Sequence, residues 1–263
     1  MRLGYLINCV LFTTKSLLRN RTTLFLLVII PAVFFIVTWY TTTNLPFWFK
    51  LSSVSENTVV KVVQSELAFV FIGLAITGLL SSFLSLILVQ MQTSEHKRLI
   101  LCGYRSGEII MAKFILLMMI VMAVTVYISL EIQLFFNPDN ATGVAAGFLL
   151  AGFVYGSYGM LIGTLFRGEL EGILFIVLLA NLDIGWLQNP VFYTAAQNKE
   201  FIRSLPSYFP SQASMVSAFS DHGILYPVLG SIGYGLLFLI SAMLIYAIRM
   251  KIRRREKVDQ VIE

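Results

Sequence analysis

The sequence predicts an all-α integral membrane protein with six transmembrane helices and an amphipathic interfacial helix at the N-terminus. Of its 263 residues, 57% are hydrophobic and 13% are charged. Apolar stretches recur along the chain, and about 20 helical residues match the roughly 30 Å hydrocarbon core of a bilayer. Because the segments between these stretches are too short for a compact soluble domain, we treat residues 1–263 as a single transmembrane domain.

Residues 1–21 predict the interfacial helix. Apolar side chains recur there at helical spacing, whereas Asn8, Lys15 and Arg19 occupy other faces. We interpret this helix as an anchor for the first span, with contact to a partner as the alternative.

Six spans follow this helix. Five of them are uninterrupted apolar stretches. The remaining one, which is the fifth along the chain, is interrupted by Asn181, Asp183 and Gly185. Pro31 lies in the middle of the first span, where a missing backbone donor predicts a kink. The predicted spans are 22–41, 67–90, 114–136, 143–166, 170–188 and 223–248.

The distribution of basic residues predicts the orientation. If the N-terminus is cytoplasmic, 15 of the 19 lysines and arginines fall on cytoplasmic segments, and Lys50, Lys61, Lys199 and Arg203 remain outside. We therefore expect a multi-pass protein of the cell membrane with both termini in the cytoplasm. The net charge of +5 then indicates contact with anionic lipid headgroups and no nucleic-acid partner.

The sequence gives little support for an enzyme. The two cysteines, Cys9 and Cys102, and the two histidines, His96 and His222, form no metal-ligand pattern, because the histidines are predicted on opposite sides. The sequence also contains no Gly-x-x-x-x-Gly-Lys-Ser/Thr phosphate loop. We expect no catalytic residue, no cofactor-binding residue and no metal site in this chain.

Glycines are spaced for close helix packing in two of the spans. We expect them to pack helices within one subunit rather than to form a dimer face. They are Gly152, Gly156, Gly159 and Gly163 in the fourth span, and Gly230, Gly233 and Gly235 in the sixth.

The second cytoplasmic loop, residues 91–113, is longer than a connector requires. It has 23 residues, whereas a simple helix connection needs about two to eight. Ser106 is expected to cap a helix that has Glu108 near its positive end. This length indicates a surface on which another protein docks.

Several of these features together resemble the permease subunits of type 2 ATP-binding cassette exporters. They are the basic end of the first helix at residues 17–21, a first span that contains Pro31, the Gly-Tyr-Arg-Ser-Gly-Glu sequence at 103–108, and Tyr-Phe-Pro at 208–210. The resemblance covers nearly the whole chain. It departs from the commonest pattern at 95–99, where this chain has Glu-His-Lys-Arg-Leu.

The resemblance implies a coupling helix that fits a cleft on a separate ATPase subunit, which would bind ATP and Mg²⁺. It also implies that two six-span permease subunits, identical or related, pair over two ATPases. The predicted coupling residues are Glu95, Gly103, Tyr104, Arg105, Ser106, Gly107 and Glu108.

Residues 189–222 form an outer segment rich in aromatic and turn residues. The resemblance implies that it enters the outer leaflet as a re-entrant hairpin, with Pro206 and Pro210 at its turn. The alternative is an ordinary interfacial loop with aromatic anchors.

Asp183 is the one acidic residue well inside a span, where ionisable groups usually face the bundle interior or a water-filled path. With Phe209 and Pro210 it makes up the predicted substrate path. Hydration, or a partner such as Arg203, would instead make Asp183 structural. Glu131, near the outer end of the third span, has a weaker claim to such a role.

The resemblance implies a permease that exports a hydrophobic or amphipathic compound, such as an antimicrobial, a drug or a lipid-like molecule, from the cytoplasm or inner leaflet. Small outer loops fit delivery to the outer leaflet or the medium. One alternative is an ATP-independent channel or sensor. Another is polysaccharide export, since Trp39, Tyr40, Phe47, Trp48 and Phe49 offer rings for sugar stacking, although an aromatic belt explains the same residues.

Overall fold

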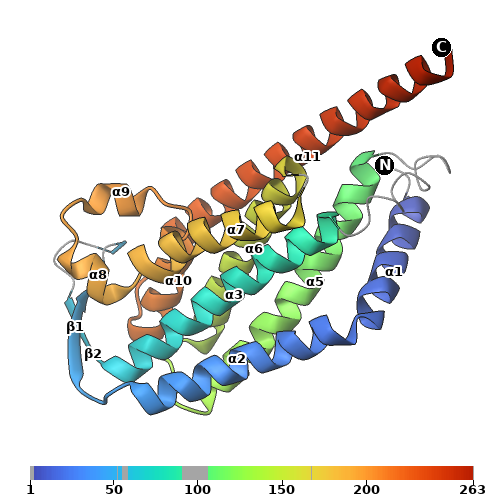
Figure 1. The fold of residues 1–263 in the computed structure, drawn as a ribbon. Helices are drawn as coiled ribbons and strands as arrows, with labels where there is room; N and C mark the ends of the chain where they lie inside the picture. Colours follow the sequence, from blue (N-terminus) through green and yellow to red (C-terminus); the bar gives the residue numbers. More distant parts are fainter. Residues whose placement is uncertain (1–2, 52, 55–58, 91–105, 167, 263) are drawn as a thin grey trace.

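Long helices dominate the computed structural model, which describes residues 3–51, 53–54, 59–90, 106–166 and 168–262 (Figure 1). Within these ranges, six helices are long and apolar enough to cross a membrane. The prediction of a helical multi-pass membrane protein is confirmed at this level. The six crossing segments are Arg21–Thr41, Gln64–Gln90, Gly107–Gln133, Ala141–Leu165, Glu169–Leu187 and Leu225–Arg249.

The first half of the chain contains an N-terminal helix, three crossing helices and a β-hairpin. In order these are α1 (Leu3–Arg19), α2 (Arg21–Thr41), β1 (Pro46–Lys50), β2 (Val59–Val63), α3 (Gln64–Gln90) and α5 (Ser106–Gln133). The second half adds α6 (Ala141–Leu165), α7 (Glu169–Ala180), the π-helix η1 (Asn181–Leu187), α8 (Pro190–Ala195), α9 (Lys199–Arg203), α10 (Tyr208–Phe219) and α11 (Leu225–Ile262).

Two helices extend well beyond the predicted spans. The third span was predicted from residue 114, but α5 already begins at Ser106. The last was predicted to end at 248, whereas α11 runs for 38 residues to Ile262. In α11 the added residues are mostly charged or polar and are good helix formers, so this helix continues beyond the apolar pattern. The residues added to α5 include an apolar run at 109–112 that belongs to its crossing segment.

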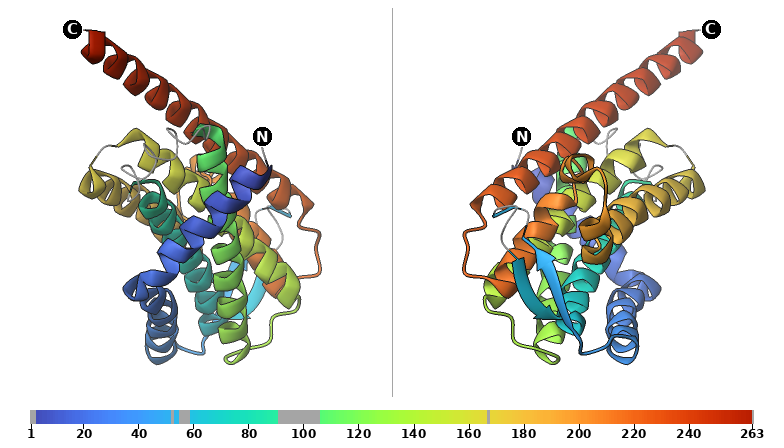
Figure 2. Two further views of the ribbon diagram at one scale, coloured as in Figure 1. Left: turned by 90° about the vertical axis from the view of Figure 1, so that its right-hand side faces the viewer. Right: turned by 90° about the vertical axis from the view of Figure 1, so that its left-hand side faces the viewer.

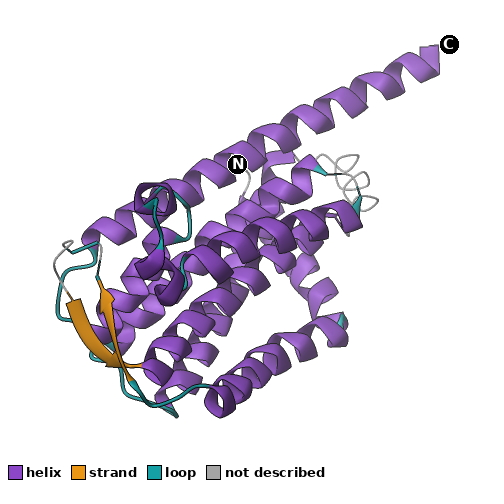
Figure 3. Cartoon of the chain, turned by 60° about the vertical axis from the view of Figure 1, so that its left-hand side comes forward, coloured by secondary structure: helices purple, strands orange, loops and turns teal. Residues whose placement is uncertain are grey.

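The prediction of an all-α fold is wrong for residues 46–50 and 59–63, where β1 and β2 pair in an antiparallel hairpin (Figure 3). Aromatic and β-branched side chains alternate between its faces, as in a half-buried strand pair. Phe49 and Val62 are buried on one face. On the other, Trp48 is opposite Lys61, whose ammonium lies 5.7 Å from the centre of the Trp48 ring.

Helices α3 and α6 form the centre of the bundle and share its most extensive contact. At Gly159, an added Cβ would lie 2.2 Å from the backbone carbonyl oxygen of Ser82, so only glycine allows this approach. Gly230 gives similar room to the ring of Phe209. The predicted packing of small residues within the chain is confirmed at these positions, whereas Gly233 faces open space.

The two ends of the bundle differ in what they carry. Helix α1 and the end of α11 lie at one end, whereas the hairpin, α8 and α9 lie at the other (Figures 1 and 2). This arrangement agrees with an even number of crossings.

Candidate functional site

The candidate site is built around a change of helix type in the fifth crossing segment. Helix α7 continues into the π-helix η1 at Asn181, where the predicted interruption lies. A π-helix accommodates an extra residue in its turn and occurs frequently at functional sites. The interruption is therefore a widening of the helix that carries Asp183.

The carboxylate of Asp183 is buried and held by donors from two other parts of the chain. It accepts hydrogen bonds from the hydroxyl of Tyr155 in α6 and from the hydroxyl of Ser207. The backbone N–H of Ser207 donates a third, at 3.2 Å. Arg203, the partner considered from the sequence, instead donates its Nε–H to the hydroxyl of Tyr193, at 3.1 Å.

Gln188 extends this network at the end of the π-helix. Its backbone N–H donates to the carbonyl oxygen of Asp183 at 3.2 Å, and its side-chain amide donates to the carbonyl oxygen of Ile202 at 3.3 Å. Asp183 and Gln188 thus connect the π-helix to α6, to α9 and to the start of α10.

Phe209 and Pro210, the other predicted path residues, lie in the first turn of α10, which begins at Tyr208 directly after Ser207. The ring of Phe209 contacts Tyr208, Tyr226 and Tyr234, with ring centres 5.4 to 5.7 Å apart. Pro210 is buried in the first turn of α10, where proline is tolerated because that N–H has no intrahelical acceptor. Through Ser207, the structure brings all three predicted path residues into one region.

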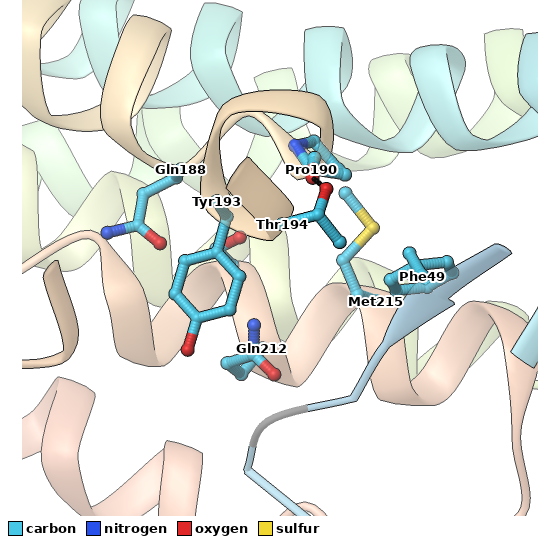
Figure 4. A pocket seen from close by; sticks show the side chains of 8 residues that line it. Phe49, Gln188, Pro190, Tyr193, Thr194, Gln212 and Met215 are labelled. Atoms are coloured by element: carbon cyan, nitrogen blue, oxygen red, sulfur yellow. Dashed lines mark hydrogen bonds between the residues drawn. The ribbon is translucent and has the colours of Figure 1, made fainter. Parts of the chain in front are cut away.

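A small cavity adjoins this region, between α8, α10 and the hairpin (Figure 4). Gln188 and Tyr193 lie on one side of it, and Phe49 and Met215 on the other (Figure 4). Its volume of about 20 Å³ is enough for a single water molecule. In this conformation it is too small for an organic substrate. The remaining lining residues are Pro190, Thr194, Ser211 and Gln212.

The opposite end of the bundle holds the described part of the predicted coupling segment. Glu95, Gly103, Tyr104 and Arg105 lie outside the described residues, whereas Ser106, Gly107 and Glu108 form the first turn of α5. Glu108 is buried. The last part of the predicted loop is therefore helical.

Basic side chains cap helix ends near this turn. The ammonium of Lys113 donates to the carbonyl oxygen of Leu88 near the end of α3, and the guanidinium of Arg249 donates to that of Thr164 near the end of α6. Cations at these positions satisfy carbonyl groups that have no helical donor and complement the negative end of the helix dipole.

Helix α1 packs against the same end of α5. Its Cys9 is buried, and this burial raises the pKa of the Cys9 thiol despite the opposing effect of the nearby Lys113 ammonium and the Thr13 hydroxyl. The thiol is therefore neutral at physiological pH.

Tyr155 and Ser207 were missed by the sequence analysis. Tyr155 lies in the glycine-rich fourth span, where a polar side chain that faces the bundle was the one available signal. Across the described ranges, no group of three or more His, Cys, Asp or Glu side chains is placed to hold a metal ion.

The fold and this site define a helical multi-pass membrane protein whose intramembrane carboxylate is satisfied internally. Comparison with models of known protein families gives no match, and comparison with curated protein sequences gives none either.

Proposed function

We propose that this chain is the permease subunit of an ATP-driven exporter, coupled to a separate ATPase through the segment that joins α3 to α5. The observation that carries this proposal is the contact between the two helix ends that flank that segment. Lys113 ties the start of α5 to the end of α3, the two points from which residues 91–105 depart. A force on the segment would therefore reach both helices together.

The proposal extends to the orientation of the chain and its two membrane-associated segments. In α1, Ile7, Leu11, Phe12 and Leu18 are exposed apolar side chains, while Cys9 and Leu17 pack inward. Such a helix has an apolar surface available for lipid. We place α1 and the basic end of α11 on the cytoplasmic side, where lysine and arginine gather.

Helix α10 is proposed to enter the outer leaflet without crossing it. Its 12 residues reach about 18 Å, well short of a bilayer. Most of its side chains are buried, and it packs against α6, α11 and α3. Non-helical backbone on either side of it is tolerable at membrane depth when protein covers it.

The exported compound is proposed to be hydrophobic or amphipathic, such as an antimicrobial, a drug or a lipid-like molecule. The hairpin and the short helices α8 and α9 are the largest described structures at the outer end. The described residues at this end form no large outer domain, which fits release of the compound into the outer leaflet or the medium.

The test is purification of the chain from native membranes in mild detergent, followed by mass spectrometry of the proteins that remain bound. We expect a phosphate-loop ATPase in about one-to-one ratio, because a permease of this class depends on its partner for ATP. Recovery of the chain alone, or with a signalling protein, would support the ATP-independent alternative.

A charge reversal then locates the contact. Arg105→Glu is expected to abolish ATPase association, whereas Glu200→Lys, an exposed reversal in α9 at the opposite end of the bundle, should retain it. Equal association of both variants would contradict the proposed docking segment.

A further inference from the structure

Four aromatic rings gather where α2, α3 and the end of α5 meet, and we refer to them as the aromatic cluster: Phe35, Trp39, Phe69 and Phe135. The closest ring centres are those of Phe69 and Phe135, 4.6 Å apart, and those of Trp39 and Phe135, 5.3 Å apart. Phe35 and Phe69 are buried, but Trp39 is 55% exposed. The cluster therefore presents an edge to the outside of the bundle.

A carboxyl group lies near the end of α5, shortly before the cluster. Glu131 is in the last turn of α5, and Phe135 lies four residues further on, in the turn that follows the helix. The preceding turn carries Tyr127, whose hydroxyl donates to the carbonyl oxygen of Val28 in α2 at 3.1 Å and also interacts with Glu131. In the sequence, Glu131 thus lies between Tyr127 and Phe135, both of which contact α2.

One acceptor on α5 and one on α2 lack a donor. The Oε2 atom of Glu131 is buried and has no hydrogen-bond partner. In α2, Pro31 has no N–H, so the carbonyl group of Leu27 lacks its usual helical donor. A buried acceptor without a donor is costly, and most of all when it is a carboxylate within a membrane span. A ligand that brings a positive charge would remove this cost.

We propose that Glu131 and the aromatic cluster form a binding site for the cationic end of an organic amphiphile, an ammonium or a guanidinium group. The carboxylate supplies the opposite charge, and the ring faces attract a cation through their quadrupoles. Apolar side chains are available for the tail, since Leu130 in α5 and Leu134 directly after it are both exposed. This inference rests on the proposed function and specifies the class of compound that the exporter takes.

The test uses tryptophan fluorescence of the purified full chain in nanodiscs of a zwitterionic lipid. The chain has three tryptophans, so Trp48→Phe with Trp186→Phe leaves Trp39 as the reporter. A second reporter, Trp39→Phe with Trp48→Phe, leaves Trp186, which is similarly exposed at 51% but lies in η1. The probe is N-dodecylpyridinium, a single-chain cation that quenches tryptophan, and the comparison compound is its neutral analogue 4-dodecylpyridine at high pH.

We expect saturable quenching of Trp39 by the cation and only proportional, partition-driven quenching of Trp186. In the Trp39 reporter, Glu131→Gln should raise the half-saturating concentration of N-dodecylpyridinium by about tenfold, because the substitution keeps the shape of the side chain but removes its charge. Glu66→Gln, an acid near the start of α3 that is not part of the cluster, should leave the concentration unchanged.

Three results would overturn the inference, provided that size-exclusion profiles and helical content match the parent protein. They are equal saturable quenching by the neutral compound, an unchanged half-saturating concentration in Glu131→Gln, or proportional quenching of Trp39. The last would mean that no binding site exists at the cluster. Because binding is measured without an ATPase, its failure leaves the ATPase association to be judged separately.

Discussion

Asp183 differs from a free intramembrane carboxylate because three donors already engage it. The hydroxyls of Tyr155 and Ser207 and one backbone N–H compensate for its burial. Contact with a transported compound would require one of these bonds to break. Asp183 therefore acts mainly by positioning η1 and the start of α10. Any effect of Asp183 on a substrate path would follow from this positioning.

Replacement of Asp183 by asparagine tests this positioning role. Asp183→Asn replaces one carboxylate oxygen by an NH₂ group, which cannot accept a hydrogen bond from the donors that surround it. We therefore expect the free energy of unfolding to fall by about 1–3 kcal/mol. The measurement is the midpoint of thermal unfolding in detergent. Asp139→Asn, at an exposed position before α6, serves as the control and should unfold like the parent.

An Asp183→Asn protein with the parent's unfolding midpoint but reduced transport would contradict this interpretation. Under the proposed function, it would mean that the carboxylate acts directly on the exported compound. Loss of stability together with loss of transport agrees with positioning.

At the scale of elements, the contact of α3 with α6 depends on the absence of side chains as much as on their presence. The Gly159 position leaves no room between its backbone and the carbonyl group of Ser82. The two helices also place hydroxyl groups along this contact, and those of Ser81, Ser82 and Ser85 donate to backbone carbonyls of α3 itself. Close approach is thus obtained without strong hydrogen bonds between the helices.

Gly159→Ala is expected to destabilise the protein by about 1–3 kcal/mol, because the added methyl group has to push α3 and α6 apart. Gly233→Ala is the matched control on α11, where the Cβ meets open space. It should be neutral or slightly stabilising, since alanine favours a helix over glycine. Unfolding in a denaturing detergent titration compares the two, and equal midpoints would refute close packing at Gly159.

The elements also mark the limits of what the sequence could predict. Membrane-spanning helices follow from composition, because about 20 predominantly apolar residues are needed to cross the bilayer, and all six were found. The hairpin was missed since five-residue strands such as Pro46–Lys50 carry a weak pattern beside helices of more than 20 residues. The helix expected to follow Ser106 is present as the start of α5, although the membrane span itself was placed only from residue 114.

The site was predicted only in part for a similar reason. Asp183 stood out because a charge inside an apolar segment is rare. Its partners lie 24 and 28 residues away in the chain, so only the packing of α6 and α10 against η1 identifies them. In a single sequence, Tyr155 carries only the signal of a polar side chain in the glycine-rich fourth span, and Ser207 carries none.

For the whole molecule, the placement of the chain ends predicts how it is accessible from each side of the membrane. With the orientation proposed above, Asp221→Cys, between α10 and α11, should react with an impermeant maleimide added to intact cells. Gln260→Cys, near the end of α11, should react only after permeabilisation. Both substitutions are made in a Cys9→Ser, Cys102→Ser background, which itself should not be labelled.

Labelling of both positions from the outside, or of Gln260→Cys alone, would contradict the orientation. The first result would mean that α11 does not place the two residues on opposite sides of the membrane. The second would mean that the orientation of the protein is the reverse of the one proposed. Neither result would alter the packing of the bundle.

The donors of Asp183 also have a consequence for the order of events during synthesis. Tyr155 is translated before Asp183, whereas Ser207 follows it by 24 residues. When the segment Glu169–Leu187 leaves the ribosome, only one of its carboxylate's three donors exists. That segment should therefore remain close to the translocation machinery, or at the bilayer surface, until α10 has emerged, and the fifth and sixth crossings should enter the lipid together.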